Sequence, residues 1–234
     1  MLIFGHMSFD EPFTRRRSLT RLGGLVVAAA GGGALLTNDA EGGNRAIESG
    51  AVSCVLTPEL TEGPYYIAGE KVRRDIREGH PGTLLTLHLA VLHASTCKPI
   101  KGAAVDIWHA DAAGNYSGFG AGAASRTFMR GIQRTGANGV ATFTTVYPGW
   151  YQGRAVHIHV KVHVGGAVVH TGQLFFSDTL TDKVYTAAPY ASRGVRDMRN
   201  AQDSIFVNGG KKSMLSVVKI GSGYVGTIAM GVHA

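Results

Sequence analysis

The sequence is short of the features that mark many metal, disordered and nucleic-acid-binding proteins. It holds only two cysteines, Cys54 and Cys97, and no CxxC spacing of the kind that structural zinc sites use. Only 17% of its residues are charged while 44% are hydrophobic, which excludes a disordered chain. The net charge is +7, but the basic residues form no stripe, so electrostatic binding of nucleic acid is not expected.

A hydrophobic run long enough to span a membrane is also missing. The main apolar stretch, residues 22–36, is 15 residues long and holds five glycines, too short and too weak for a stable membrane anchor. It follows Arg15-Arg16-Arg17-Ser18-Leu19-Thr20, and together they resemble a twin-arginine export signal. We expect a signal and cleavage region at 1–40, a linker at 41–53 and one domain at 54–234, in a protein exported to the periplasm or beyond.

Export bears on whether the two cysteines are oxidised. An even number of cysteines in an oxidising compartment favours a disulfide between Cys54 and Cys97. Such a bridge would close a loop of about 43 residues and stabilise the fold by about 4 kcal/mol. Two separate buried thiols remain the alternative.

The chain after Cys54 has the alternation of short strands rather than the period of helices. The 33 glycines of the full sequence are scattered through turns as well as clustered near the N-terminus, and Asn138-Gly139 and Gly165-Gly166 are typical of tight hairpins. A helix is indicated only weakly, within residues 179–200. The sequence therefore predicts an all-β fold, an antiparallel β-sandwich with long active-site loops and at most one short helix. The expected strands cover residues 85–92, 103–108, 128–134, 140–146, 156–164, 168–176, 215–220 and 224–230.

The most informative segment runs from Tyr151 to His159. In an extended strand, His157 and His159 project from the same face, and Ile158 points to the other. Two neutral imidazoles held in this way form half a metal site that suits zinc, copper, iron or nickel. An ordinary strand with two surface or paired histidines is the alternative interpretation.

Further ligands must come from elsewhere in the chain. No Asp or Glu is close in sequence to the histidines, which disfavours the ferrous site of two histidines and one carboxylate. Tyrosines are better placed: Tyr151 ends a Pro-Gly turn before the strand, and Tyr65 and Tyr66 follow Gly63-Pro64. A phenol titrates near pH 10, so only a strongly charged cation would keep it deprotonated at neutral pH. Phenolates favour ferric iron.

At this point the chain resembles the intradiol ring-cleavage dioxygenases, a family that includes catechol, hydroxyquinol and protocatechuate dioxygenases and exported relatives. The resemblance covers residues 54–230. It is carried by four ordered motifs and by a typical segment at 102–118 that ends in Tyr116-Ser-Gly118. The motifs are Gly63-Pro64-Tyr65-Tyr66, Pro148-Gly149-Trp150-Tyr151, Arg154-Ala-Val-His157-Ile-His159 and Gln173.

The resemblance implies an Fe(3+) cofactor held by Tyr66, Tyr151, His157 and His159. Tyr66 is preferred to Tyr65 because the family ligand is the last residue of Gly-Pro-x-Tyr. Catalytic roles fall to Arg154, Tyr151 and Gln173, and substrate contacts to Tyr65, Arg154 and Gln173.

The implied reaction cleaves a catechol-type ring between its two hydroxyl carbons with O2 and gives a cis,cis-muconate-type diacid. The alternatives are a secreted β-sandwich binding module without catalysis and a copper or zinc protein on the same scaffold. The preferred catechol and the oligomeric state do not follow from the sequence.

Overall fold

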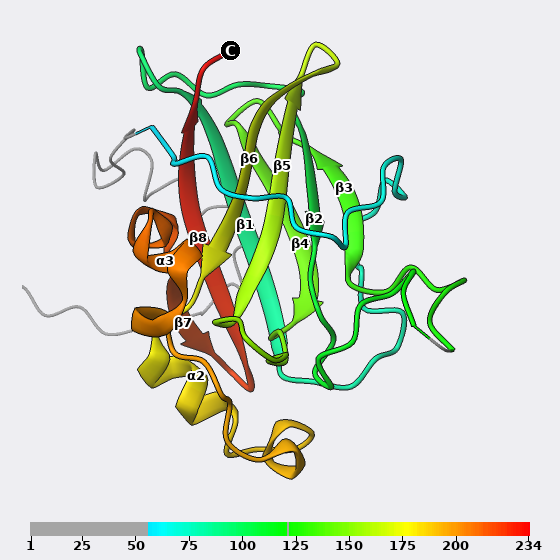
Figure 1. Cartoon of the computed structure of the whole chain (residues 1–234). Coiled ribbons are helices and arrows are strands. Elements are labelled where there is room, and N and C mark those ends of the chain that lie inside the picture. Colours follow the sequence, from blue (N-terminus) through cyan, green and yellow to red (C-terminus); the bar gives the residue numbers. More distant parts are fainter. Residues whose placement is uncertain (1–55, 121) are drawn as a thin grey trace, which may run out of the picture. The chain divides into compact units, whose positions relative to one another are not determined.

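The computed structural model describes residues 56–120 and 122–234, within which eight strands form two packed four-stranded sheets (Figure 1). The strand order is β4-β1-β8-β7 in the first sheet and β3-β2-β5-β6 in the second. The strands are β1 (Leu84–His93), β2 (Ala104–Trp108), β3 (Arg130–Arg134), β4 (Val140–Val146), β5 (His157–Val164), β6 (Ala167–Phe175), β7 (Ser216–Ile220) and β8 (Gly223–Val232).

The core lies between the sheets and follows the alternation of the strands. Leu87 and Leu89 of β1 face Ile107 of β2 and Val160 of β5 across this layer, and all four are fully buried. Each such side chain contributes about 1.5–3 kcal/mol relative to exposure, as an upper estimate. The predicted all-β sandwich is confirmed.

Three details of the prediction are wrong. The turn at Asn138-Gly139 joins β3 to β4 in the other sheet, so it is not the hairpin that was predicted. β1 pairs with β8 in parallel, so the first sheet is mixed rather than wholly antiparallel. The described residues also contain two short α-helices, α2 (Asp178–Val184) and α3 (Ser204–Val207), where at most one was expected. Three 3-10 turns accompany them, η1 (Tyr190–Arg193), η2 (Asn200–Gln202) and η3 (Gly210–Ser213). The sequence of α3 is rich in strand formers, but Asp203 caps its first turn.

The outer face of the second sheet carries the histidines and is covered by an extended segment, residues 56–76. Figure 1 shows this segment crossing over β6 and β5 toward β3. The Leu60 amide donates to the Thr171 carbonyl (3.0 Å), and Val72 bridges to Ile132 of β3. A side chain facing outward from β5 is therefore buried beneath this segment instead of meeting solvent.

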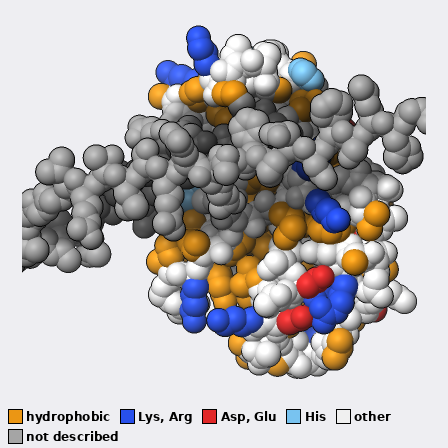
Figure 2. Space-filling view, turned by 90° about the vertical axis from the view of Figure 1, so that its left-hand side faces the viewer, with side chains coloured by type: hydrophobic (Ala, Val, Ile, Leu, Met, Phe, Trp, Pro, Cys, Tyr) orange, Lys and Arg blue, Asp and Glu red, His pale blue; other side chains and the backbone are white. Residues whose placement is uncertain are grey.

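Charged side chains are dispersed on one face of the described residues. On the face seen in Figure 2, the lysines and arginines of the described residues lie in separate groups, and one group adjoins acidic side chains. In the described part of the chain, no helix is long and apolar enough to cross a membrane.

Several sequence predictions fall on residues 1–55, outside the described ranges. These are the export signal at 1–40, the linker at 41–53 and Cys54. The bridge between Cys54 and Cys97 therefore stays a prediction.

Candidate metal centre

The two histidines of β5 converge as the alternation predicts. The Nε2 atoms of His157 and His159 lie 3.0 Å apart, and both residues are buried on the outer face of the sheet. The carbonyl of Ala155 lies 2.6 Å from His157 Nδ1 and accepts its proton, which leaves the Nε2 lone pair free for a metal. Burial lowers the pKa of His157 to about 3 and that of His159 well below its usual value. Both rings are therefore neutral at physiological pH.

Tyr151 brings a phenol oxygen to the same point. Its hydroxyl lies 3.1 Å from His157 Nε2. The turn before it is held because the Gly149 amide donates to the carbonyl of Asp111 (2.9 Å). A side chain at Gly149 would meet the carbonyl oxygen of Ala112 at 2.4 Å, so this close approach requires glycine. The predicted grouping of Tyr151, His157 and His159 is present in the structure.

The second tyrosine beside this group is Tyr116, from the loop after β2. Its ring centroid lies 5.6 Å from that of Tyr151 and 6.2 Å from that of His159. Its hydroxyl faces that of Tyr151 but forms no hydrogen bond of good geometry among the described residues. Burial raises its pKa well above the usual value. Tyr116 thus places a buried phenol oxygen that has no hydrogen bond of good geometry to any described residue in a ring cluster with Tyr151 and His159. Such a group calls for an explanation, and a bound ion is one candidate.

The loop that carries Tyr116 is anchored on both sides. The Asp111 carboxylate accepts hydrogen bonds from the amides of Ala113 and Asn115, both at 2.9 Å. Beyond Tyr116, the buried Arg130 donates to the carbonyl (2.7 Å) and the hydroxyl (2.9 Å) of Ser117. The position of the Tyr116 ring is thus set by its neighbours in the loop.

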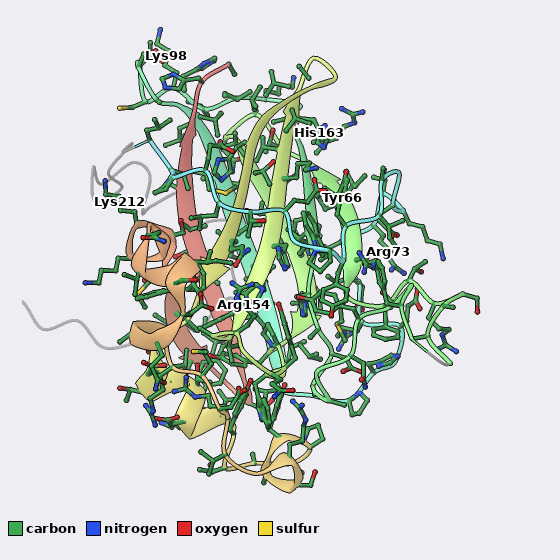
Figure 3. The ribbon with its side chains drawn as sticks, in the orientation of Figure 1. Tyr66, Arg73, Lys98, Arg154, His163 and Lys212 are labelled. Atoms are coloured by element: carbon green, nitrogen blue, oxygen red, sulfur yellow. The ribbon has the colours of Figure 1, made fainter. Side chains whose placement is uncertain are left out.

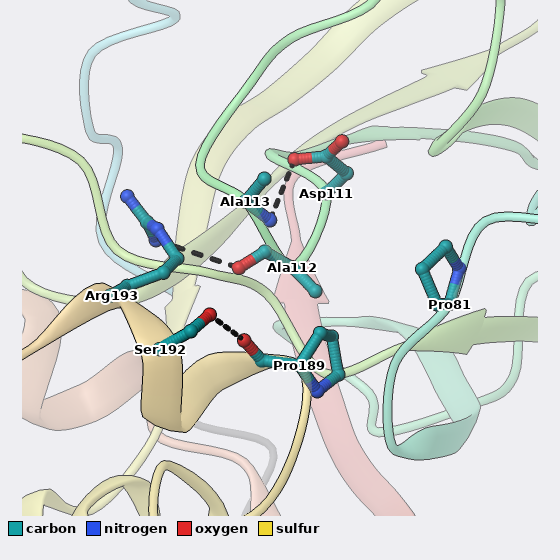
Figure 4. Close-up of a pocket in the computed structure, with 7 residues that line it drawn as sticks. All are labelled: Pro81, Asp111, Ala112, Ala113, Pro189, Ser192 and Arg193. Carbon is teal, nitrogen blue, oxygen red and sulfur yellow. Dashed lines mark hydrogen bonds between the residues drawn. The ribbon is translucent and has the colours of Figure 1, made fainter.

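A small pocket lies behind the same loop and is drawn in Figure 4. At its rim, Arg193 donates to the Ala112 carbonyl (3.5 Å), and its guanidinium lies 4.6 Å from the ring centre of Trp150. These contacts join the η1 turn to the two segments that carry Tyr116 and Tyr151. They support the loop.

Tyr66, the expected fourth ligand, lies elsewhere. Its ring packs on Trp108 (4.8 Å), and the Lys161 ammonium lies 3.7 Å from the ring centre. Its hydroxyl faces the carboxylate of Asp106. Burial, and to a lesser extent the negative charge of Asp106, raises the pKa of Tyr66 to about 12. Asp106 and Lys161 pair across β2 and β5, one pleat beyond the pair of Trp108 and His159. Figure 3 shows Tyr66 well separated from Arg154 at the start of β5. The structure therefore directs the Tyr66 hydroxyl toward Asp106.

Tyr65 adjoins the group through its aromatic ring. Its ring stacks on Tyr116 at 4.2 Å with an interplanar angle of 13°, and its edge-on contact with Tyr151 spans 6.1 Å. Phe119 adds a further edge contact at 5.1 Å. Tyr65 is only partly buried, so these rings form an aromatic wall that a flat ligand could contact.

Arg154 and Gln173 are linked beside the histidines. Arg154 Nη2 donates to Gln173 Oε1 (2.5 Å), and Gln173 Nε2 donates to the Thr61 carbonyl (2.8 Å). Gln173 lies directly opposite His159 in the sheet. Arg154 Nε also donates to the carboxylate of Asp203 at 2.9 Å, a partner that the sequence analysis did not foresee.

The donor set fits one metal ion. Two ligand atoms that each lie about 2.1 Å from an ion, with a ligand–ion–ligand angle of about 90°, are about 3.0 Å apart. This distance matches the separation of the two imidazole nitrogens. No group of three or more His, Cys, Asp or Glu side chains suited to a metal occurs in the described residues. The phenol side chains beside the imidazoles belong to Tyr116 and Tyr151.

Known proteins resemble this chain in sequence and in fold. The sequence model of a family described as Dioxygenase matches residues 61–208. The chain belongs to the intradiol ring-cleavage dioxygenase family. A solved intradiol ring-cleavage dioxygenase from Tetranychus urticae is 37% identical, with a TM-score of 0.73, over 76% of this chain and 95% of that one.

Two further relatives bear on the match. The dioxygenase domain of a dioxygenase carbohydrate-binding protein fusion from Streptomyces sp. SirexAA-E is 32% identical, with a TM-score of 0.59, over 75% of this chain and 96% of that one. Catechol 1,2-dioxygenase 1 from Acinetobacter lwoffii is 37% identical over 119 residues, 48% of this chain and 36% of that protein. The match thus spans about a third of the length of this curated relative.

Two residues of the site were missed as such in the sequence. Tyr116 was noted only as part of a typical segment, although its place in a glycine-rich loop directly after the strand that pairs with β5 was a usable signal. Asp203 carries no local signal, because it lies 49 residues from Arg154.

Proposed function

We propose that the protein is a ferric dioxygenase that cleaves a catechol-type ring between its two hydroxyl carbons with O2 and yields a cis,cis-muconate-type diacid. The observation that carries this proposal is the convergence of three donor atoms. The Tyr151 oxygen lies 3.1 Å from His157 Nε2, and His157 Nε2 lies 3.0 Å from His159 Nε2. The buried Tyr116 hydroxyl lies beside them. Family membership and relatives named catechol 1,2-dioxygenase support it.

Fe(3+) would be held by Tyr116, Tyr151, His157 and His159. When bound, ferric iron supplies a Lewis acid that polarises a chelated catecholate toward O2, and no external reductant is needed. His157 and His159 present neutral nitrogens, because burial keeps both rings unprotonated.

The two tyrosines differ in their surroundings, and this suggests different roles. Tyr116 is buried to 5% exposure, whereas Tyr151 is only partly buried. We assign to the Tyr151 oxygen the acceptance of a proton from a catechol hydroxyl on binding. Tyr116 stays in place as the fixed anionic donor.

Other side chains would orient the substrate ring. Tyr65 and Phe119 form a wall that excludes water from one side. The Arg154 guanidinium, held by Gln173 and Asp203, places a fixed positive charge beside the imidazoles. Such a preorganised charge stabilises electron density that builds up on oxygen.

We further propose that the protein works outside the cytoplasm. The support is the twin-arginine pattern at residues 15–20 and a chemistry that needs no cytoplasmic nicotinamide cofactor. A fusion of residues 1–40 to a reporter that is active only after export tests this. Replacing Arg16 and Arg17 with lysine should abolish export.

The activity is tested by oxygen uptake of the iron-loaded protein with catechol, hydroxyquinol, protocatechuate and caffeate-like diols. Resorcinol, whose hydroxyls cannot chelate one ion, serves as the substrate control. His159→Ala should abolish uptake, and His163→Ala, a change on the same strand outside the site, should leave it intact. Iron binding without uptake for any diol would favour a non-catalytic module. Selective binding of copper or zinc would favour the other alternative.

A further inference from the structure

Asp203 occupies an unusual position between a helix and the candidate metal centre. It is 2% exposed, and each of its two carboxylate oxygens accepts two hydrogen bonds. Oδ1 accepts from the amides of Ile205 (2.8 Å) and Phe206 (3.3 Å) and so caps α3. Oδ2 accepts from Arg154 Nε (2.9 Å) and from the Ala155 amide (2.8 Å). One oxygen thus serves the helix and the other serves the segment that enters β5.

The contact with Ala155 leads directly to a histidine. The amide of Ala155 donates to Asp203, and its carbonyl accepts from His157 Nδ1 at 2.6 Å. That second bond sets which nitrogen of His157 carries the proton and how its ring is turned. A shift of the backbone at Ala155 would therefore rotate the imidazole whose Nε2 faces Tyr151.

The contact with Arg154 fixes a second group. The Arg154 guanidinium donates hydrogen bonds at two points, from Nε to Asp203 and from Nη2 to Gln173. Charge-assisted hydrogen bonds of this kind are short and directional, so they orient a planar guanidinium well. Without Asp203, only the bond to Gln173 would hold the arginine.

We propose that Asp203 is a positioning residue that aligns Arg154 and, through Ala155, the imidazole of His157. This role rests on the proposed function, and Asp203 itself touches neither metal nor substrate in it. Removing a partner that orients a ligating histidine typically costs 10- to 100-fold in metal affinity or activity.

The test separates positioning from capping. Asparagine and serine both cap helices well, so Asp203→Asn and Asp203→Ser should keep α3. Asparagine has one oxygen that accepts and one NH2 group that cannot, so it can serve the helix amides or the Arg154 and Ala155 donors but not both pairs. Serine is too short to reach both pairs. Asp182→Asn is the matched control, since it weakens ion pairs with Arg196 and Arg199 away from the site.

We expect kcat with catechol to fall about 10- to 100-fold in the Asp203 variants while melting temperatures stay close to that of Asp182→Asn. The visible absorption of the iron-loaded variants should shift. In the metal-free protein, hydrogen exchange at the Ala155 amide should accelerate, and exchange in the sandwich core should not change.

Two outcomes would overturn the role: Asp203 variants that match Asp182→Asn in kcat and in exchange at Ala155, or exchange that accelerates uniformly, as for general loosening. A wild-type protein that neither develops colour with iron nor consumes oxygen would refute the proposed function instead. Exchange in the metal-free protein would still decide whether Asp203 orders the segment.

Discussion

Replacing Tyr116 with phenylalanine should have opposite effects with and without iron. In the metal-free protein the Tyr116 hydroxyl is buried and forms no hydrogen bond of good geometry in the described part of the chain. An unsatisfied buried polar group costs about 1–3 kcal/mol. Tyr116→Phe should therefore raise the free energy of unfolding by about 1 kcal/mol, or the melting temperature by about 2–4 °C in a protein of this size.

Iron should reverse the order of stability. A ligand that binds only the folded state at 100 times its Kd adds about 2.7 kcal/mol, and the variant loses one of the four donors that hold it. Wild type should then be the more stable protein, and the tyrosinate colour of the variant should weaken sharply. Differential scanning fluorimetry and visible spectra, each with and without iron, measure both effects.

The control is Tyr66→Phe, a change of the same kind in the same aromatic cluster. Because the Tyr66 hydroxyl faces Asp106, this variant should keep its colour and the stabilisation by iron. Bleaching by Tyr66→Phe and none by Tyr116→Phe would refute our placement of the fourth ligand and restore the assignment made from the sequence.

Two further predictions concern the backbone and pH. Gly63→Ala places a methyl group 3.1 Å from His159 Cε1 at a φ of +72°, whereas Gly69→Ala, at +76°, meets nothing within 4 Å. Both should lose about 1–2 kcal/mol of stability, and only Gly63→Ala should weaken iron binding in a chelator competition; equal affinities would contradict the contact. Burial lowers the pKa of His109 from 6.5 to about 4. Between pH 6.5 and 4 this histidine is therefore protonated in the unfolded state and neutral in the folded state. The metal-free protein should lose up to about 1.4 kcal/mol per pH unit on acidification through this window from His109 alone. Urea unfolding of His109→Gln should show a shallower pH dependence, and an unchanged slope would exclude this histidine as its cause.

The sandwich and half of the site could be predicted from the sequence because both depend on local alternation. The period of two places His157 and His159 on one face wherever the strand lies. The hairpin at Gly165-Gly166 sets the bounds of β5 and β6 within a residue of those predicted. The turn at Asn138-Gly139 also marks the start of β4, although it carries the chain from one sheet to the other instead of forming a hairpin. These features need no knowledge of distant segments.

The rest depends on tertiary paths that alternation does not encode. Whether Tyr66 or Tyr116 meets the histidines is decided by how the covering segment 56–76 crosses the sheet, and it turns the Tyr66 ring toward Lys161. The parallel pairing of β1 with β8 joins residues more than 130 positions apart. Asp203 likewise acts across 48 residues on Ala155.

Resonance Raman spectroscopy of the protein loaded with one equivalent of Fe(3+), excited in the visible band, tests the central claim most directly. We predict tyrosinate vibrations in the wild type and in Tyr66→Phe, and their weakening in both Tyr116→Phe and Tyr151→Phe. A protein that binds its full equivalent of iron yet shows no tyrosinate signal would contradict the two-phenolate, two-imidazole site.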